Sequence, residues 1–179
     1  MKYAICYSSK TGNTKMLAEA IENRMNRLAK KHKTNGTRSY ECIYIGEPSR
    51  DALEADVIFL GFWTDRGKCD EVAEEFLPQI RKTKIILFGT CGFGGSHQYY
   101  QQILGNVADE MDATAEIIGS FMCQGKMPQS VGDRYEAMLA KEPENQQAKL
   151  MLKNYESAKT HPDKADLDLL KKVVAKLFA

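Results

Sequence analysis

Residues 2–14 read KYAICYSSKTGNT, in which an apolar run is followed at once by hydroxyl side chains, a lysine and a glycine. The run at residues 3–7 is short and does not alternate between polar and apolar side chains, which is typical of a strand buried on both faces. The following residues, KMLAEAI, carry apolar side chains at helical spacing. A buried strand, a glycine-containing loop and an amphipathic helix are the first unit of an α/β fold.

The same succession repeats along the chain. Further strands are predicted at residues 40–45, 57–60, 85–88 and 117–123, and a glycine follows each of them. Amphipathic helices are predicted at residues 13–31, 70–79 and 97–111. Because strands and helices alternate, parallel pairing through right-handed crossovers is expected. The sequence therefore predicts an α/β doubly wound three-layer sandwich with a five-stranded parallel sheet.

The C-terminal third is predicted to be helical. Helical patterns lie at residues 134–140, 145–159 and 167–178, and Pro143 and Pro162 interrupt them. The length of 179 residues is that of one domain, and no linker or internal repeat divides the chain. We expect a single domain over residues 1–179, in which residues 126–160 are a helical insertion before the last helix.

The composition limits the class of protein and its partners. A net charge of +1 gives no general attraction to nucleic acid or to an anionic membrane, so neither is expected as a partner. No run approaches the roughly 20 apolar residues of a membrane span, and the N-terminal apolar stretch is too short for a signal peptide. Five cysteines without a C-x-x-C pair read as reduced thiols. These features predict a cytoplasmic protein.

The first loop has residue types that suit a phosphate group. In open α/β sheets ligands collect at the carboxyl ends of strands, and helix N-termini favour anions. Gly12 lets the backbone approach a ligand closely, and Asn13 tolerates turn geometry. The hydroxyl donors are Ser8, Ser9, Thr11 and Thr14. A helix cap requires one hydroxyl, so four of them favour a phosphate site over a cap alone. The Walker A and G-x-G-x-x-G patterns are absent, which argues against a nucleoside triphosphate or a dinucleotide.

Residues 9–14, SKTGNT, resemble the FMN phosphate loop of the flavodoxin family, [TS]-x-T-G-x-T, at every fixed position. The resemblance extends over about residues 1–125 and implies a flavodoxin-like domain with strand order 2-1-3-4-5 and bound FMN. It assigns the phosphate to Ser9, Thr11 and Thr14 and leaves Ser8 at the strand end. The charge of Lys10 is expected to act either on the phosphate or on the flavin.

Two further loops are implied to cover the flavin ring. In GFWTDRGK, residues 61–68, the resemblance places Trp63 against the ring, with Phe62 as a second candidate; packing against the neighbouring helix is the alternative for both. Gly67 is expected to let its peptide reorient toward a flavin nitrogen, since glycine has little steric bar to such a change. The predicted contacts from this loop are Phe62, Trp63, Thr64, Asp65 and Gly67.

The loop after the fourth strand, TCGFGGS, contains three glycines between Thr90 and Ser96. The glycines could serve turn geometry alone, or could let backbone groups approach the ring. The loop has no tyrosine where family members often have one, and Phe93 is the substitute aromatic residue that we expect. The predicted contacts from this loop are Thr90, Cys91, Gly92, Phe93 and Gly94. Cys91 is expected to be a small loop residue rather than a redox thiol.

The charge pattern is expected to bear on the potential of the flavin. Residues 1–40 carry nine Lys or Arg and two acids, whereas residues 41–80 carry three and ten. Acids at 65, 70, 71, 74 and 75 would lower the potential if they lie near the ring, while Lys10 and Arg66 would raise it. The opposite net charges of these two segments also predict a dipolar molecule.

The resemblance implies an FMN-binding electron-transfer protein that passes electrons to a partner reductase. The segments GFWTDRGK, FGTCGFGG and FMCQGKMP also resemble flavodoxin-like proteins associated with bilin or other tetrapyrrole reductases. Two alternatives stay open. One is an FMN-dependent NAD(P)H or quinone reductase, or a protoporphyrinogen-type oxidase, with the C-terminal helices as a substrate wall; the other is a flavin-free binding module. No Cys or His pair has zinc-site spacing, so no metal is predicted.

Overall fold

The computed structural model describes residues 1–36, 38–94 and 96–178. Its centre is a parallel sheet with strand order β2-β1-β3-β5-β6, and a short antiparallel strand, β4, pairs only with β3. Without β4 this is the order 2-1-3-4-5 expected from the resemblance. The strands are β1 (Lys2–Tyr7), β2 (Glu41–Gly46), β3 (Val57–Asp65), β4 (Lys68–Cys69), β5 (Lys84–Cys91) and β6 (Glu116–Gln124).

Alternate residues of the central strands enter two separate cores. Tyr3 and Ile5 of β1 pack on one side of the sheet, and Ala4 and Cys6 pack on the other. All four are essentially inaccessible to solvent. This arrangement explains the apolar runs without alternation, since each face of a doubly covered strand requires an apolar side chain.

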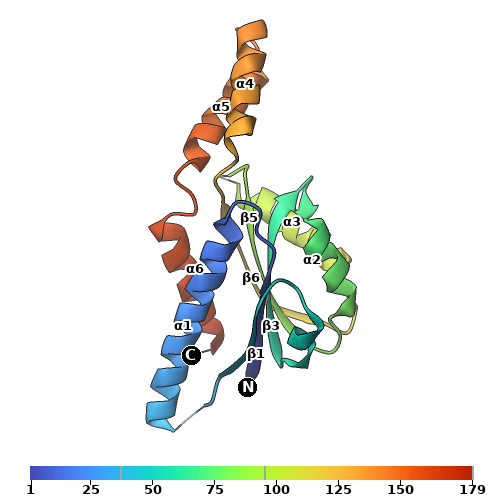
Figure 1. Ribbon diagram of the computed structural model, residues 1–179, viewed down its shortest axis with the longest axis vertical. Helices are drawn as coiled ribbons and strands as arrows, with labels where there is room; N and C mark the ends of the chain where they lie inside the picture. The colour runs from blue at the N-terminus through green and yellow to red at the C-terminus, as the bar shows by residue number, and fades with distance from the viewer. Residues whose placement is uncertain (37, 95, 179) are drawn as a thin grey trace.

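Helices cover both faces of the sheet, as Figure 1 shows: α1 and α6 lie on one side, and α2 and α3 lie on the other. The doubly wound three-layer sandwich predicted from the sequence is therefore confirmed. The covering helices are α1 (Asn13–Asn35), α2 (Glu71–Phe76), α3 (His97–Asp109) and α6 (Lys164–Phe178). Leu17, Ile21 and Met25 of α1 are fully buried, as their helical spacing predicts.

The remaining two helices, α4 (Gln129–Lys141) and α5 (Gln146–Ala158), form a helical hairpin. The hairpin projects beyond the carboxyl ends of the strands, at the top of Figure 1, and its two helices pack against each other. Tyr155 of α5 lies against Gly132 of α4, where an added Cβ would come within 2.4 Å of the tyrosine ring. The predicted insertion thus becomes a protruding hairpin rather than another layer of the sandwich.

Several elements differ from the sequence prediction. The α2 helix ends at Phe76 and continues as a 3-10 turn, Leu77–Gln79, because Pro78 cannot donate to an α-helical bond. Val72, an apolar residue of α2, is 47% exposed, whereas Ala73 and Phe76 of the same helix are buried. The β4 strand and the 3-10 helix Arg50–Glu54 were not predicted, since such short elements leave no periodic signal. No helix within the described residues is long and apolar enough to cross a membrane.

Candidate functional site

A cavity of about 620 Å³ lies at the carboxyl ends of the strands. Three strand-end loops of the sandwich contribute to it, and so do the start of α3 and the base of the hairpin. From the first loop come Lys10, Thr11 and Asn13; from the other two strand-end loops come Trp63 to Gly67 and Thr90 to Phe93. Its volume is typical of a small-molecule site.

The first loop turns sharply at Gly12, which has φ +85° and is the N-cap of α1. That left-handed conformation favours glycine, which has no side chain of its own to cap α1. The Thr11 hydroxyl lies at the cavity, and the buried Asn13 side chain donates to it at 2.9 Å. Asn13 also donates to the Lys126 carbonyl at 2.8 Å, which ties the loop to the base of the hairpin. The helix start and the exposed Thr11 hydroxyl together form an anion-binding geometry.

The other hydroxyls of the loop are engaged within the protein. Ser8 is buried and donates to the Asp70 carboxylate. The Ser9 hydroxyl accepts from the Lys15 amide at 3.2 Å, and the Thr14 hydroxyl lies 3.3 Å from both the Phe62 carbonyl and the Thr90 hydroxyl. Ser9 and Thr14, which the resemblance assigned to the phosphate, are not among the residues that line the cavity, and that assignment stays a prediction.

Trp63 and Phe62 have different surroundings. Trp63 is half-buried at the cavity, and the Lys10 ammonium lies 5.1 Å from the centre of its ring, which is a cation–π contact. Lys10 is thus placed by the tryptophan as well as by its loop. Phe62 is fully buried in the core, where an added Cβ at Gly89 would come within 2.8 Å of its ring. The alternative interpretation, helix packing, therefore fits Phe62, whose side chain the structure does not bring to the cavity.

The buried carboxylate of Asp70 holds the Trp63 loop in place through hydrogen bonds. Its side chain is 2% exposed and accepts hydrogen bonds from the Ser8 hydroxyl, the Trp63 amide (3.2 Å) and the Val72 amide (3.2 Å). The last of these bonds caps the N-terminus of α2. The sequence analysis placed Asp70 among acids near the ring, but its carboxylate is an internal link. An Asp directly before the helical run EVAEEF was the signal for this role.

The turn between β3 and β4 projects Arg66 and Gly67 into the cavity lining. Both have positive φ, +48° and +84°, as a two-residue type I′ hairpin turn requires. The Gly67 carbonyl accepts from the Asn106 side chain of α3 at 2.8 Å. Any reorientation of the Gly67 peptide would therefore exchange this bond for another one.

The glycine loop owes its composition to close packing rather than to turn geometry. A Cβ at Gly92 would lie 2.7 Å from Met127, and one at Gly94 would lie 2.3 Å from the Gln124 amide. Neither glycine has a positive φ, so room for neighbouring side chains is what excludes larger residues. The third glycine of the prediction, Gly95, lies outside the described residues.

Side chains around this loop complete one wall of the cavity. Phe93 is 42% exposed, and Tyr99 at the start of α3 also faces the cavity. Burial raises the pKa of the Cys91 thiol, which is consistent with a small packing residue. The Thr64 hydroxyl is buried at the cavity beside the Cys91 thiol, whose pKa its hydrogen bond lowers by less than burial raises it. A thiol is a weak hydrogen-bonding partner, so a ligand in the cavity can compete for this hydroxyl.

The base of the hairpin forms the opposite wall, and the sequence analysis named none of its residues as cofactor contacts. Tyr135 of α4 is buried at the cavity, and the Arg134 guanidinium lies 5.4 Å from the centre of its ring. The wall consists of Gly125, Lys126, Met127, Pro128, Val131, Arg134 and Tyr135. The segment FMCQGKMP includes the first four of them, but no motif marked Val131, Arg134 or Tyr135, because their place depends on how the hairpin meets the sheet.

The lining of the cavity is positively charged. Among the described residues it contains four cations, Lys10, Arg66, Lys126 and Arg134, and one acid, Asp65. The other acids expected near the ring lie on α2 or are engaged: Glu74 pairs with Lys68, and Asp70 is internal. This balance favours an anionic ligand.

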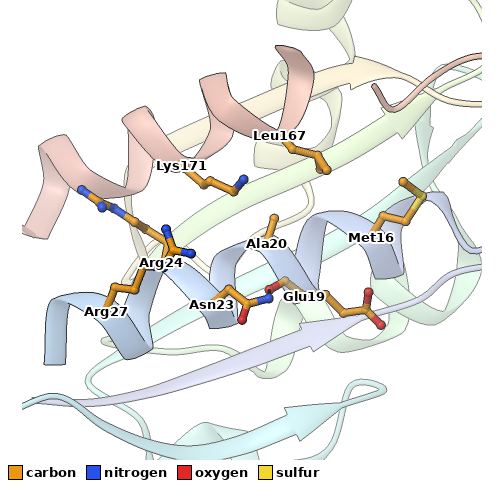
Figure 2. Close-up of a pocket in the computed structure, with 8 residues that line it drawn as sticks. All are labelled: Met16, Glu19, Ala20, Asn23, Arg24, Arg27, Leu167 and Lys171. Atoms are coloured by element: carbon orange, nitrogen blue, oxygen red, sulfur yellow. Dashed lines mark hydrogen bonds between the residues drawn. The ribbon is translucent and has the colours of Figure 1, made fainter. Parts of the chain in front are cut away.

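A second groove, of about 380 Å³, lies between α1 and α6. Figure 2 shows its side chains, which come from these two helices and include Arg24, Arg27 and Lys171. Met16 is 40% exposed at one end of the groove. The lining contains no aromatic ring and no strand-end loop, so it lacks the features of a cofactor site.

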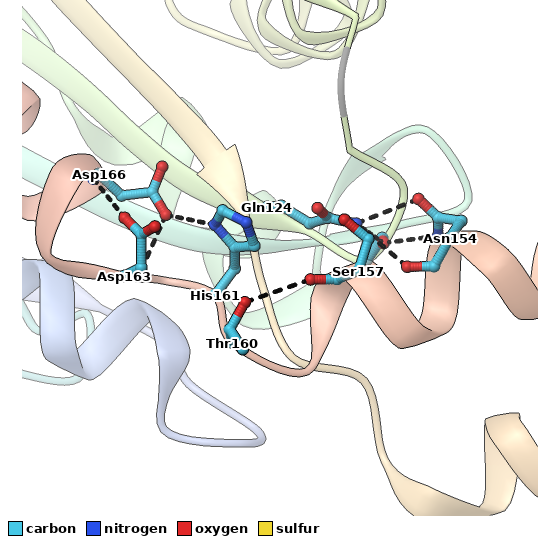
Figure 3. Close-up of polar contacts among 8 residues, drawn as sticks. Gln124, Asn154, Ser157, Thr160, His161, Asp163 and Asp166 are labelled. Carbon is cyan, nitrogen blue, oxygen red and sulfur yellow. Dashed lines mark hydrogen bonds and ion pairs between the residues drawn. The ribbon is translucent and has the colours of Figure 1, made fainter.

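His161, Asp163 and Asp166 bring their side-chain ligand atoms within 4.8 Å of one another, a proximity that their spacing did not signal. Their hydrogen bonds account for this arrangement, as Figure 3 shows. The Asp163 carboxylate accepts from the Asp166 amide, and the Asp166 carboxylate accepts from the Asp163 amide, both at 2.9 Å. This is a capping box at the start of α6, with His161 held against Asp166 at 2.6 Å.

Comparison with known proteins assigns the family. The family model described as the flavodoxin domain matches residues 4–175. The chain belongs to the flavodoxin family. Among curated proteins, the flavodoxin-like domain-containing protein BilS of Clostridium symbiosum is 42% identical, and that of Clostridioides difficile is 33% identical; each alignment covers 93% of this chain and 90% of the relative.

Flavodoxins of known structure share the fold at low sequence identity. An archaeal flavodoxin aligns with a TM-score of 0.54 at 19% identity, and the alignment covers 99% of this chain and 96% of the archaeal chain. The azoreductase AzrA aligns with a TM-score of 0.57 at 11% identity, over 98% and 100% of the two chains. Proteins of the flavodoxin fold generally bind a flavin, and the residues of the cavity fit one. A cationic lining, a half-buried tryptophan and a helix start beside Thr11 match a planar ring that carries a phosphate.

Proposed function

We propose that the protein binds FMN noncovalently in the cavity at the carboxyl ends of the strands and transfers electrons to a partner reductase. The observation that carries the proposal is that one cavity joins the anion-binding start of α1 to the half-buried ring of Trp63. A phosphate and an aromatic ring can thus be bound by a single site. Bound FMN would supply the redox chemistry, as cofactors do in general.

Different residues of this chain would bind the phosphate and the ring. Thr11 and the backbone at the start of α1 would hold the phosphate, with Gly12 allowing the close approach. Trp63 would cover one face of the ring, and the Lys10 ammonium over the tryptophan would add positive charge near both parts of the ligand. Phe93, Tyr99 and Tyr135 are the other aromatic residues at the cavity that could contact the ring.

The partner is proposed to be a reductase that acts on a bilin or another tetrapyrrole. The three sequence segments that resemble proteins of this kind support the proposal, and so does the name BilS of two relatives. The charge distribution is compatible with oriented docking: α1 and α6 carry an excess of Lys and Arg, whereas α2 carries three glutamates and no base.

One observation favours a second function, an FMN-dependent reductase that acts without a partner protein. The base of the hairpin lines the same cavity, so α4 is placed to form the substrate wall of an enzyme. Electron transfer to a partner and direct reduction of a small acceptor make different kinetic predictions.

Anaerobic kinetics on the FMN-loaded protein separate the two functions. A carrier is expected to consume NAD(P)H only when a donor reductase is added, and then to reoxidise at a rate that depends on the concentration of the acceptor protein. Steady consumption of NAD(P)H with a small quinone and no second protein would contradict the carrier and favour the enzyme. A protein that takes up no FMN would support neither function and would leave the binding module.

A further inference from the structure

A side chain of the hairpin is hydrogen-bonded to the glycine loop. Asn154 of α5 donates to the Gly92 carbonyl at 3.0 Å, and its side-chain oxygen accepts from the Gly94 amide at 3.2 Å. The two backbone partners fix which end of the amide is oxygen, because a carbonyl can only accept and an amide N–H can only donate. Asn154 therefore bridges the two ends of the segment 92–94.

A second amide from the sheet supports this bridge. Gln124, at the end of β6, is 7% exposed and donates to the Asn154 side-chain oxygen at 3.1 Å and to the Gly92 carbonyl at 3.2 Å. Figure 3 shows the two side chains meeting at this point. Since a Cβ at Gly94 would lie 2.3 Å from the Gln124 amide, the loop packs directly on the pair. Segment 92–94 is thus bonded to a strand end and to the hairpin at once.

Hydrogen bonds at the base of the hairpin hold Asn154 in its position. The two chain segments that join the hairpin to the sandwich are bonded to each other, with the Lys126 amide donating to the His161 carbonyl at 2.8 Å. The capping box at Asp163 and Asp166 then anchors the second segment to α6. The α5 helix is therefore held where Asn154 reaches the loop, while α4 faces the cavity with Tyr135.

We propose that Asn154 is a positioning residue of the flavin site: it holds Gly92 and Gly94 in the conformation that receives the ring, so that the hairpin is part of the site. This inference rests on the proposed binding of FMN. It predicts a defect that concerns the ring and not the phosphate, because the bonded segment lies in the glycine loop and not in the loop at Thr11.

Asn154→Ala is the direct test, with Lys153→Ala as the matched control on an exposed neighbouring position of α5. In the flavin-free protein, NMR is expected to show at least fivefold faster hydrogen exchange at the Gly94 amide in Asn154→Ala and no change in the control. Titration with FMN and with riboflavin, which lacks the phosphate, is expected to give about tenfold weaker binding of both, by the same factor.

Two further variants separate the two hydrogen bonds of Asn154 from each other and the ring from the phosphate. Asn154→Asp keeps an acceptor for Gly94 but loses the donor to Gly92, so Gly94 exchange is expected to stay slow while both flavins bind more weakly. Thr11→Val is expected to weaken FMN and to leave riboflavin unchanged. Circular dichroism of each variant checks that the fold is intact.

The possible failures are distinguishable. If the wild-type chain binds neither flavin, the proposed function fails, and the exchange of Gly94 still reports on the bridge. If the wild type binds FMN but Asn154→Ala binds both flavins with unchanged affinity, the positioning role is overturned. Loss of FMN affinity with unchanged riboflavin affinity in Asn154→Ala would overturn it as well, because the residue would then act on the phosphate.

Discussion

The two sides of the cavity are held in place by different kinds of contact. On the sandwich side, the buried carboxylate of Asp70 accepts three hydrogen bonds and links the first strand end, the Trp63 loop and α2. On the hairpin side, the half-buried amide of Asn154 bridges two backbone groups of the glycine loop. The first link belongs to the folded core, whereas the second joins a protruding element to it. We therefore expect loss of the Asp70 link to affect stability, and loss of the Asn154 link to affect ligand binding.

The largest effect is expected for Asp70→Ala. The substitution removes the cap of α2 and leaves the Trp63 amide and the Ser8 hydroxyl without their acceptor, so the free energy of unfolding should fall by about 3 kcal/mol. Urea unfolding of the flavin-free protein measures the change. Glu71→Ala, at the exposed next position, is the control and should stay within about 0.5 kcal/mol of the wild type. A loss below 1 kcal/mol in Asp70→Ala would contradict the role given to the carboxylate.

Trp63→Leu tests the aromatic face on the sandwich side. Removing the ring should weaken FMN and riboflavin equally, by about tenfold, because stacking contributes about 1 kcal/mol beyond the buried area. Stability should change little, since Trp63 is only half-buried. Quenching of flavin fluorescence measures both affinities. Trp63→Phe keeps an aromatic face and should retain most of the affinity; an equal loss in both variants would show that the ring is not the contact.

Gly67→Ala examines the turn at the cavity. A side chain at φ +84° costs about 1 kcal/mol, and reorientation of this peptide also breaks the bond to Asn106. If the peptide reorients when the flavin is reduced, this strain differs between the two redox states, and the first one-electron midpoint potential should shift by about 40 mV. Spectroelectrochemical titration measures it, with Gly105→Ala as a control at a glycine that has open space around it. Unchanged potentials in Gly67→Ala would remove the idea.

The smallest effect is expected on the hairpin side, for Arg134→Gln. This exposed cation is one of four at the cavity, so its loss should weaken FMN binding about twofold at low ionic strength and have no effect at high salt. Riboflavin binding should not change. Lys153→Gln removes an equal charge elsewhere on the hairpin and should leave both affinities as they are. A salt-independent loss in Arg134→Gln would point to a direct hydrogen bond instead of long-range attraction.

Features of the site that depend on residues adjacent in sequence could be predicted, whereas contacts between distant segments could not. The order of strands and helices follows from apolar periodicity, and the turn at Gly12 follows from a motif whose residues are adjacent in sequence. The hydrogen bonds of the loop hydroxyls did not follow, because Thr14 and Ser8 contact Phe62 and Asp70, which are distant in sequence. Asn154 and Tyr135 had no signal at all, since contacts between distant segments depend on the packed hairpin.

The central claim is that the cavity binds FMN through both its phosphate and its ring. Titration of the purified flavin-free protein with FMN and with riboflavin, followed by flavin fluorescence, tests this most directly. The account predicts one flavin bound per chain, strong quenching next to Trp63, and tighter binding of FMN than of riboflavin. Equal affinity for the two ligands would contradict the phosphate site, and no binding of either at micromolar concentration would contradict the claim as a whole.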